Sequence, residues 1–392
     1  MQQFAEVQST TSTTPTKPID ILCAEGIGLP FSNLVSPPIK SPGKKLFQCE
    51  PISTKKGKEK KGENVNFAWK DPPVVNLDMN PDEVKQRTGF LSMTMLLSFT
   101  FVACDGDINL IQKRCSPLTW LEEWFFYYEL TWGRSLTNWW TAKDKYGPKK
   151  EVMRMIFRRK LALVKRARQR WPLFASYQED MLLRKPKWNI KFRERGGDKF
   201  RIVMWDMTGI NSYKSAAADL QRVTYSKYYA GNCLKGGIFI QPCSWGGTWR
   251  LWTGRESDSG YHEKSGYVQA QEQFQNKDLV PLSVETPEKK EVVPFTNYLD
   301  KGYRARAVNW RCGKQRTVQP VFGKSGQKFK GIDAKFSGSV ASDRSGNERE
   351  ANISKRSGFI KAGFKTNMDP RMFEDVWLTW SFQANFMYHQ IL

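Results

Sequence analysis

The chain has 392 residues, of which 40% are hydrophobic and 13% aromatic, enough apolar material to bury a core and to build two or three domains. Its 62 lysines and arginines outnumber 39 acidic residues, which gives a formal net charge of +23 at pH 7. A charge of this size is typical of proteins that bind an extended polyanion, above all nucleic acid, and less often an anionic membrane. A basic surface that is merely solvated is the alternative.

The cysteines and histidines argue against a zinc-finger protein. The seven cysteines are scattered, none belongs to a CxxC pair, and the only histidines are His262 and His389. An odd number of cysteines without an apolar leader segment favours a reducing compartment. Any metal ion is therefore expected to be held by oxygen ligands.

Residues 1–80 are expected to form a flexible basic tail, rich in serine, threonine and proline, as in STTSTTPTKP and TKKGKEKKGE. The lysines between 55 and 61 are typical of a nuclear-import signal or of an arm that binds DNA without sequence preference. A linker that only aids solubility is an equal alternative. The expected location is the nucleus.

Residues 81–195 are expected to form a helical DNA-binding region. Its most apolar stretch, FLSMTMLLSFTFVAC at 90–104, is shorter than the roughly 20 residues that a membrane span needs and predicts a buried helix. The CDGD sequence that follows predicts a turn, because the rest of a calcium-loop spacing is missing. No membrane association is expected.

The segment from 118 to 172 predicts a helix pair joined by a tight turn, the layout of a helix-turn-helix. Thr119 is a suitable N-cap, breaks are expected at Gly133 and at YGP, and Pro148 is expected in the first turn of the next helix. In that helix an inner face of apolar residues recurs at helical spacing, and it consists of Val152, Met155, Ile156 and Leu163.

The basic charge is concentrated in this region. Residues 143–201 hold 20 lysines and arginines against 6 acidic residues, so they contribute +14 of the total +23. Such a density favours contacts with DNA phosphates, which position a duplex and specify little sequence, over an ordinary solvated helix face. The residues expected to contact DNA are Lys149, Lys150, Arg154, Arg158, Arg159, Lys165 and Arg166.

After residue 195 the pattern changes to that of an α/β domain, expected to extend over 196–375. Strands are predicted in FRIVMWDMTGI, twice in LKGGIFIQPCSWGGTWRLWTG, and just before Asp300 in TNYLDKGYRARAVNW. VASDRSGNEREANISKRSGF predicts a helix. Residues 276–294 are expected to be a polar insertion, and residues 376–392 a C-terminal tail.

Three carboxylates stand out in this domain. Asp206 interrupts the apolar run IVMWDMTGI, where a carboxylate is costly to bury unless a positive group meets it. Asp300 follows a short strand, and Glu348 lies in the predicted helix. Carboxylates from neighbouring strands and one helix can share two divalent cations. Alternatively, the aspartates are turn formers or caps, and Glu348 pairs with Arg344 or Arg349.

The stretch from Trp205 to about Phe364 resembles the catalytic domain of DDE transposases of the Harbinger-like superfamily. WDMTGI is similar to the first-aspartate motif of that family, YLDKGYRA to the second, and RSGNER to its glutamate signature. YSKYYAGNCLKGGIFIQ and GRESDSGY resemble the blocks between them. The chain departs from the family at Met207, where a small residue is usual, and at Glu350, which competes with Glu348 as the third acidic residue.

This resemblance implies a ribonuclease-H-like mixed sheet flanked by helices, preceded by the mostly helical domain. It implies that Asp206, Asp300 and Glu348 bind two Mg²⁺ or Mn²⁺ ions and are the catalytic residues. The supporting residues would be Asp258, Lys227, Lys235, Arg344 and Arg349, the lysines steadying the scissile phosphate and the arginines fixing Glu348 or contacting the DNA backbone. Simple surface charge is the alternative for the lysines and arginines, and a structural turn for Asp258.

The implied function is that of a DNA transposase and endonuclease, which cuts transposon ends and transfers the freed 3′ hydroxyl to target DNA. Its partners would be terminal inverted repeats, target DNA, further copies of the chain and a separate Myb-like DNA-binding protein. Two other functions are considered. One is a domesticated DNA-binding protein without catalysis; the other is a basic nuclease of repair or RNA processing on the same kind of fold.

Overall fold

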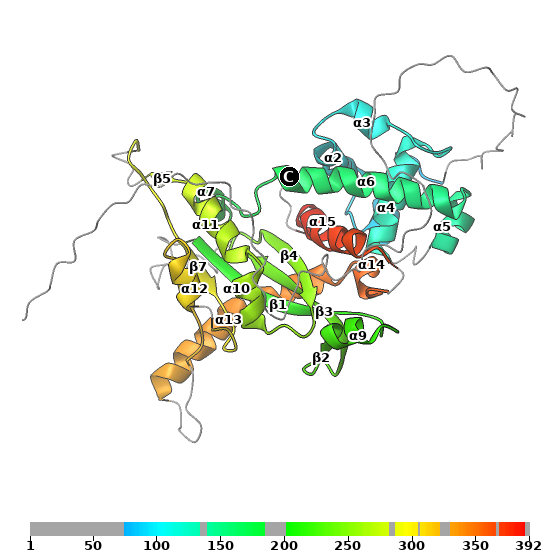
Figure 1. Cartoon of the computed structure of the whole chain (residues 1–392). Helices are drawn as coiled ribbons and strands as arrows, with labels where there is room; N and C mark the ends of the chain where they lie inside the picture. Colours follow the sequence, from blue (N-terminus) through cyan, green and yellow to red (C-terminus); the bar gives the residue numbers. More distant parts are fainter. Residues whose placement is uncertain are drawn as a thin grey trace, which may run out of the picture.

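The computed structural model describes residues 74–133, 139–184, 201–281, 287–304, 306–321, 330–365 and 368–388. An N-terminal helical region precedes a mixed, curled sheet flanked by helices (Figure 1). Residues 1–73 of the expected tail lie outside the described residues. Residues 74–80 belong to the folded helical region, since Val75 is buried and the Val74 N–H donates to Glu122 at 3.0 Å. The tail expected to reach residue 80 therefore ends earlier.

Helices of the N-terminal region begin after polar residues whose side chains accept hydrogen bonds from the first backbone N–H groups of the helix. Thr119 forms a capping box with Glu122, as its position in the sequence predicted, and Asp107 in the CDGD turn caps the short helix after it. The helices are α1 (Pro81–Thr88), α2 (Met93–Ala103), α3 (Ile108–Gln112), α4 (Trp120–Trp132), α5 (Trp139–Tyr146), α6 (Lys150–Arg170) and α7 (Tyr177–Leu183).

Helix α2 confirms the buried helix predicted within residues 90–104. Leu96 and Phe99 are buried, and the ring of Phe99 lies 5.0 Å from the ring of Phe386 in the C-terminal helix. Among the described residues, no helix combines the length and the apolar character that crossing a membrane requires.

Helices α5 and α6 form the predicted turn-joined pair. Gly147 adopts a left-handed conformation with φ of 92°, which glycine allows without steric cost. Because α6 begins at Lys150, Pro148 lies before the helix and not in its first turn. The inner face also differs from the expected one: Ile156 is buried, but Met155 is exposed, and Met153, Phe157, Leu161 and Val164 complete the buried stripe.

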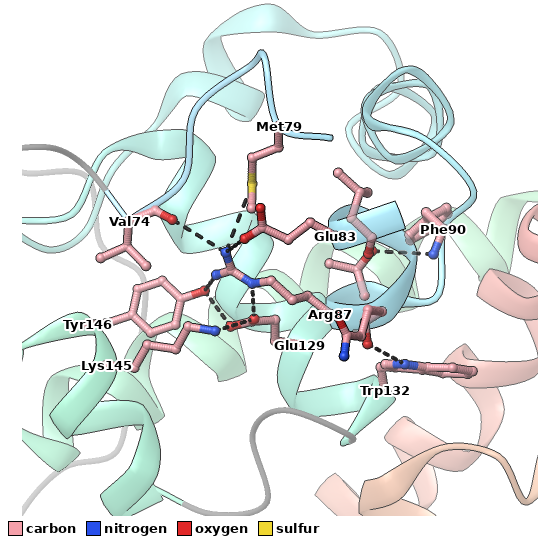
Figure 2. Close-up of polar contacts among 12 residues, drawn as sticks. Val74, Met79, Glu83, Arg87, Phe90, Glu129, Trp132, Lys145 and Tyr146 are labelled. Carbon is pink, nitrogen blue, oxygen red and sulfur yellow. Dashed lines mark hydrogen bonds and ion pairs between the residues drawn. The ribbon is translucent and has the colours of Figure 1, made fainter. Parts of the chain in front are cut away.

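Figure 2 shows a buried polar cluster that ties α1, α4 and α5 together. The Glu129 carboxylate in α4 is fully buried, accepts a hydrogen bond from Tyr146 Oη at 2.6 Å, and pairs with Lys145 Nζ at 2.7 Å and with Arg87. Arg87 also reaches Glu83 at 3.0 Å. A buried carboxylate of this kind is tolerated because positive and donor groups surround it.

The central sheet is mixed. Its strands are β1 (Arg201–Asn211), β2 (Tyr225–Ser226), β3 (Gly231–Ile240), β4 (Gly246–Thr253), β7 (Phe295–Tyr298) and β8 (Arg316–Val318). Strand β3 pairs antiparallel with β1, β2 and β4, whereas β7 runs parallel to both β1 and β8. These elements confirm the four strands predicted from the apolar runs. At the expected insertion, residues 276 and 277 still belong to a helix, and β5 (Val280–Pro281) pairs with β6 (Lys290–Glu291).

Helices cover the sheet and join it to the helical region. They are α9 (Ala218–Thr224), α10 (Asp258–Lys264), α11 (Tyr267–Lys277), α12 (Arg306–Arg311), α13 (Gly331–Ser354), α14 (Gly358–Lys361) and α15 (Pro370–Tyr388). Helix α13 packs on β1 and β3 and confirms the helix predicted around RSGNER. Figure 1 shows α15, in red, between β4 and α6, both of which it contacts.

Helix α15 corrects the expectation of a C-terminal tail over 376–392. Trp377 and Trp380 are buried, and the Trp377 indole N–H donates to the carbonyl of Trp249 at 2.7 Å. Ser381 Oγ and Asn385 Oδ1 accept hydrogen bonds from backbone N–H groups of β4 at 3.1 Å each. The described part of this segment is thus a core element.

Candidate functional site

Asp206 lies in the middle of β1, the strand at the centre of the sheet. Strand residues before it are buried, and Trp205 stacks on Tyr267 with ring centroids 3.7 Å apart. These contacts fix the backbone on which the Asp206 side chain stands. That side chain is 31% exposed, so the carboxylate lies at a surface and is reachable from solvent.

Asp300 lies two residues beyond the end of β7, the parallel neighbour of β1. The parallel register pairs Met204 with Tyr298, and Asp206 and Asp300 each lie two residues further along, which places them near one another. Arg344 of α13 connects them: its Nη2 lies 3.2 Å from Asp206 Oδ2, and its Nη1 lies 3.0 Å from Asp300 Oδ1. Only 13% of the Arg344 side chain is exposed. A largely buried guanidinium therefore joins the two predicted catalytic aspartates.

The electrostatics of this site are dominated by desolvation. Burial raises the pKa of Asp206 above its usual range, while the Arg344 charge and the Met207 N–H lower it. The charges of Asp300 and Asp258 add to the upward shift of the Asp206 pKa. Burial raises the pKa of Tyr303 well above its usual value, and Asp206 and Asp258 raise it further. Burial thus disfavours the charged form of Asp206, and the Arg344 charge offsets part of that effect.

Asp258 and Lys235 form a second pair beside this site. Lys235 is on β3, its side chain is largely buried, and its Nζ lies 2.7 Å from Asp258 Oδ1 at the start of α10. Asp258 also follows Ser257, the N-cap of α10. Its position at the start of a helix agrees with a structural role, and its contact with Lys235 agrees with a supporting role in the site. Lys227 is exposed on the loop between β2 and β3.

Glu348 is not brought to the two aspartates. It is exposed on α13, one turn after Arg344, and Arg349 beside it is exposed as well. Arg344 reaches Asp206 and Asp300, a role that differs from the expected one of fixing Glu348. Glu350 is buried, and burial raises its pKa to about 8. It lies against Gly246 of β4, where an added Cβ would come within 2.5 Å of its carboxylate.

The described residues hold no group of three or more acidic, histidine or cysteine side chains that would hold a metal ion. Asp206 and Asp300 supply two convergent carboxylates, which suit one hard divalent cation. Glu348, one turn after Arg344 on α13, does not join them in such a group. The guanidinium of Arg344 lies where it meets both aspartates.

The basic residues of α6 lie mainly on its outer face. Arg154, Arg158, Arg159 and Arg166 are exposed, as is Lys149 just before the helix, whereas Lys150 is half-buried. Lys165 pairs with Asp375 of α15 at 2.8 Å. Of the residues expected to contact DNA, Lys165 therefore has a clear structural role as well.

The sequence placed Arg344 beside Glu348 or the DNA backbone, from the RSGNER motif and the four-residue spacing, and gave no signal for its contacts with the two aspartates. Its contacts with Asp206 and Asp300 span 138 and 44 residues of chain. Comparison of the chain with protein-family models, curated proteins and solved structures found no match.

Proposed function

We propose that this protein is a DNA endonuclease and strand transferase of the DDE transposase type, which cuts transposon ends and joins their 3′ hydroxyls to target DNA. The observation that carries the proposal is the convergence of Asp206 and Asp300, from adjacent parallel strands, on one guanidinium group. The sheet supports a ribonuclease-H-like fold, because β1 has the antiparallel strand β3 on one side, with β2 and β4 beyond it, and the parallel strands β7 and β8 on the other.

The two aspartates are the residues that would hold a divalent cation. When bound, such an ion stabilises charge on a phosphodiester and activates the attacking oxygen. The chain itself supplies a rigid mount for Asp206 in β1 and a position for Asp300 at the same sheet edge. Lys235 holds Asp258, whose negative charge acts on Asp206. Glu348 carries no step in this arrangement.

The exposed face of α6 is the proposed contact with duplex DNA. Replacing Arg154, Arg158 and Arg159 together by glutamine is expected to weaken duplex binding and to lower the salt slope of log K, by up to about 0.9 for each phosphate that these side chains neutralise. Fluorescence anisotropy at several salt concentrations measures both quantities.

The matched control removes three exposed lysines elsewhere, Lys277, Lys289 and Lys290, and changes the net charge by the same amount. If both triple variants lose the same affinity and slope, α6 is not the DNA-binding face and only the overall charge matters.

The experiment that tests the catalytic proposal is nicking of supercoiled plasmid by the full chain with Mg²⁺ or Mn²⁺, comparing wild type with variants of Asp206 or Asp300. A substrate with paired inverted repeats, beside random DNA and RNA, separates a transposase from a nuclease of repair or RNA processing. Selective cutting and joining at one repeat sequence supports the first, and cleavage of every substrate alike supports the second.

A second candidate function is DNA binding without catalysis. It is favoured by Arg344, whose guanidinium neutralises both aspartates, and by the absence of a third carboxylate grouped with them among the described residues. The same nicking experiment decides between the two. Binding of DNA by a wild-type protein that cuts none of these substrates, with either metal ion, supports this second function.

A further inference from the structure

The hairpin formed by β2 and β3 presents aromatic rings to solvent beside the candidate catalytic strand. Tyr225 is in β2, and residues 227–230 form the loop that leads to β3, with Lys227, Tyr228 and Tyr229 at its tip. The Tyr228 side chain is 86% exposed, and Tyr225 and Tyr229 are each more than two-fifths exposed. Figure 1 shows β2 and α9 projecting beyond the sheet below β3.

Tyr229 is held against β1 at Gly209. Its Oη accepts a hydrogen bond from the Gly209 N–H at 3.1 Å, and its ring lies over that glycine. A Cβ at Gly209 would approach the ring to 2.6 Å, so only glycine allows this contact. The Tyr228 ring packs edge-on against Tyr229 with centroids 4.9 Å apart. The exposed ring of Tyr228 is thus braced on the strand that carries Asp206, three residues from that position.

A hollow of about 900 Å³ opens beside these rings. Tyr225 and Tyr228 line it, and cationic side chains surround them: Arg222, Lys227, Lys235 and Arg255. The single acidic residue that lines it, Glu256, pairs with Lys264 at 3.3 Å. Lys235, which lines the hollow, also contacts Asp258, one of the expected supporting residues.

We infer that this hollow binds an unpaired segment of DNA, with a base stacked on Tyr228 and phosphates beside the surrounding cations. Exposed tyrosines among basic residues suit single-stranded nucleic acid, because every base has a face for stacking and the backbone needs positive charge. A duplex hides those faces within its own stack. The inference rests on the proposed function, since that function makes DNA the substrate of this chain.

The test measures binding of a short single-stranded DNA containing 2-aminopurine, by anisotropy and by fluorescence quenching, to the full chain. We expect Tyr228→Ala to weaken single-strand binding about 5- to 10-fold and to reduce quenching, because one base no longer has a ring to stack on. Tyr228→Phe keeps the ring and should bind like wild type. The matched control is Trp310→Ala, which removes an aromatic ring that is 56% exposed and lies 5.2 Å from a lysine ammonium, but on α12.

Single-strand affinity and quenching that stay at wild-type values in Tyr228→Ala would overturn the inference. An equal loss of duplex binding in Tyr228→Ala would also overturn it. A changed oligomeric state with unchanged DNA affinity would overturn it too, because it would assign the rings to a protein contact. Tighter binding of a matched single-stranded RNA, with the same dependence on Tyr228, would assign the hollow to RNA and overturn the choice of DNA. The Asp300→Asn variant should bind the single strand normally; if it also cuts DNA normally, the proposed function fails while the binding result stands.

Discussion

The Asp300→Asn variant is expected to lose at least about a hundredfold of the metal-dependent DNA nicking activity, since several kcal/mol of electrostatic stabilisation would go with the carboxylate. Asparagine has nearly the same shape, and Asp300 lies on the surface with 55% of its side chain exposed. The fold should therefore survive, and the loss should be in the rate. Nicking of supercoiled plasmid with Mg²⁺ or Mn²⁺, followed over time, measures it.

The matched control is Asp333→Asn, which removes an acidic group in the first turn of α13, the helix that carries Arg344. It should nick like wild type. Equal rates in wild type and Asp300→Asn would show that any nicking comes from elsewhere, and Asp300 would lose its assignment as a catalytic residue.

The Glu129→Ala variant is expected to lose about 3 to 5 kcal/mol of unfolding free energy, the usual cost of removing one partner from a buried ion pair. The substitution leaves the largely buried Arg87 guanidinium without its main carboxylate and leaves Tyr146 Oη without its acceptor at 2.6 Å. Because this cluster joins α1, α4 and α5, the helical region should loosen (Figure 2). Urea unfolding followed by tryptophan fluorescence measures the change.

Glu83→Ala is the control for the same cluster. Glu83 also pairs with Arg87, at 3.0 Å, but half of its side chain is exposed, so its removal should cost no more than about 1 kcal/mol. A Glu129→Ala protein as stable as the Glu83→Ala protein would mean that the buried cluster contributes little to the fold.

The strands of the sheet could be predicted from the sequence because each is a short apolar run with its own boundaries. The segments of β1, β3, β4 and β7 all carry β-branched or aromatic residues between glycines or polar turns. Their pairing could not be predicted in the same way. The antiparallel pairing of Asp206 with Ile238 and the parallel pairing of β1 with β7 depend on contacts between distant parts of the chain.

The C-terminal helix shows a different reason for failure. The segment FEDVWLTWSFQANFMY contains serine, threonine, glutamine and asparagine among its aromatic residues, which weakens the apolar pattern of a core helix. In the structure Ser381 and Asn385 satisfy backbone groups of β4, so they are core residues of α15 despite their polarity. Such a role is visible only when the partner strand is known.

The two aspartates and Arg344 could be predicted as residues of the candidate site, but the contacts of Arg344 with both aspartates could not. Asp206 and Asp300 stand out because each interrupts or follows an apolar strand, and the structure brings them to one guanidinium. Helical spacing placed Arg344 beside Glu348, but the direction of its side chain is set by how α13 lies on β1 and β3. The orientation of α13 thus decides which carboxylates the Arg344 guanidinium contacts.

The role of the two aspartates as metal ligands can be measured without relying on turnover, by electron paramagnetic resonance of Mn²⁺ added to the full chain in complex with an already cleaved duplex. We expect wild type to bind Mn²⁺ and the Asp206→Asn, Asp300→Asn double variant to lose this binding while keeping its affinity for DNA. Mn²⁺ binding that is equal in the two proteins, or absent from both, would contradict the assignment of these aspartates to a metal-dependent catalytic site.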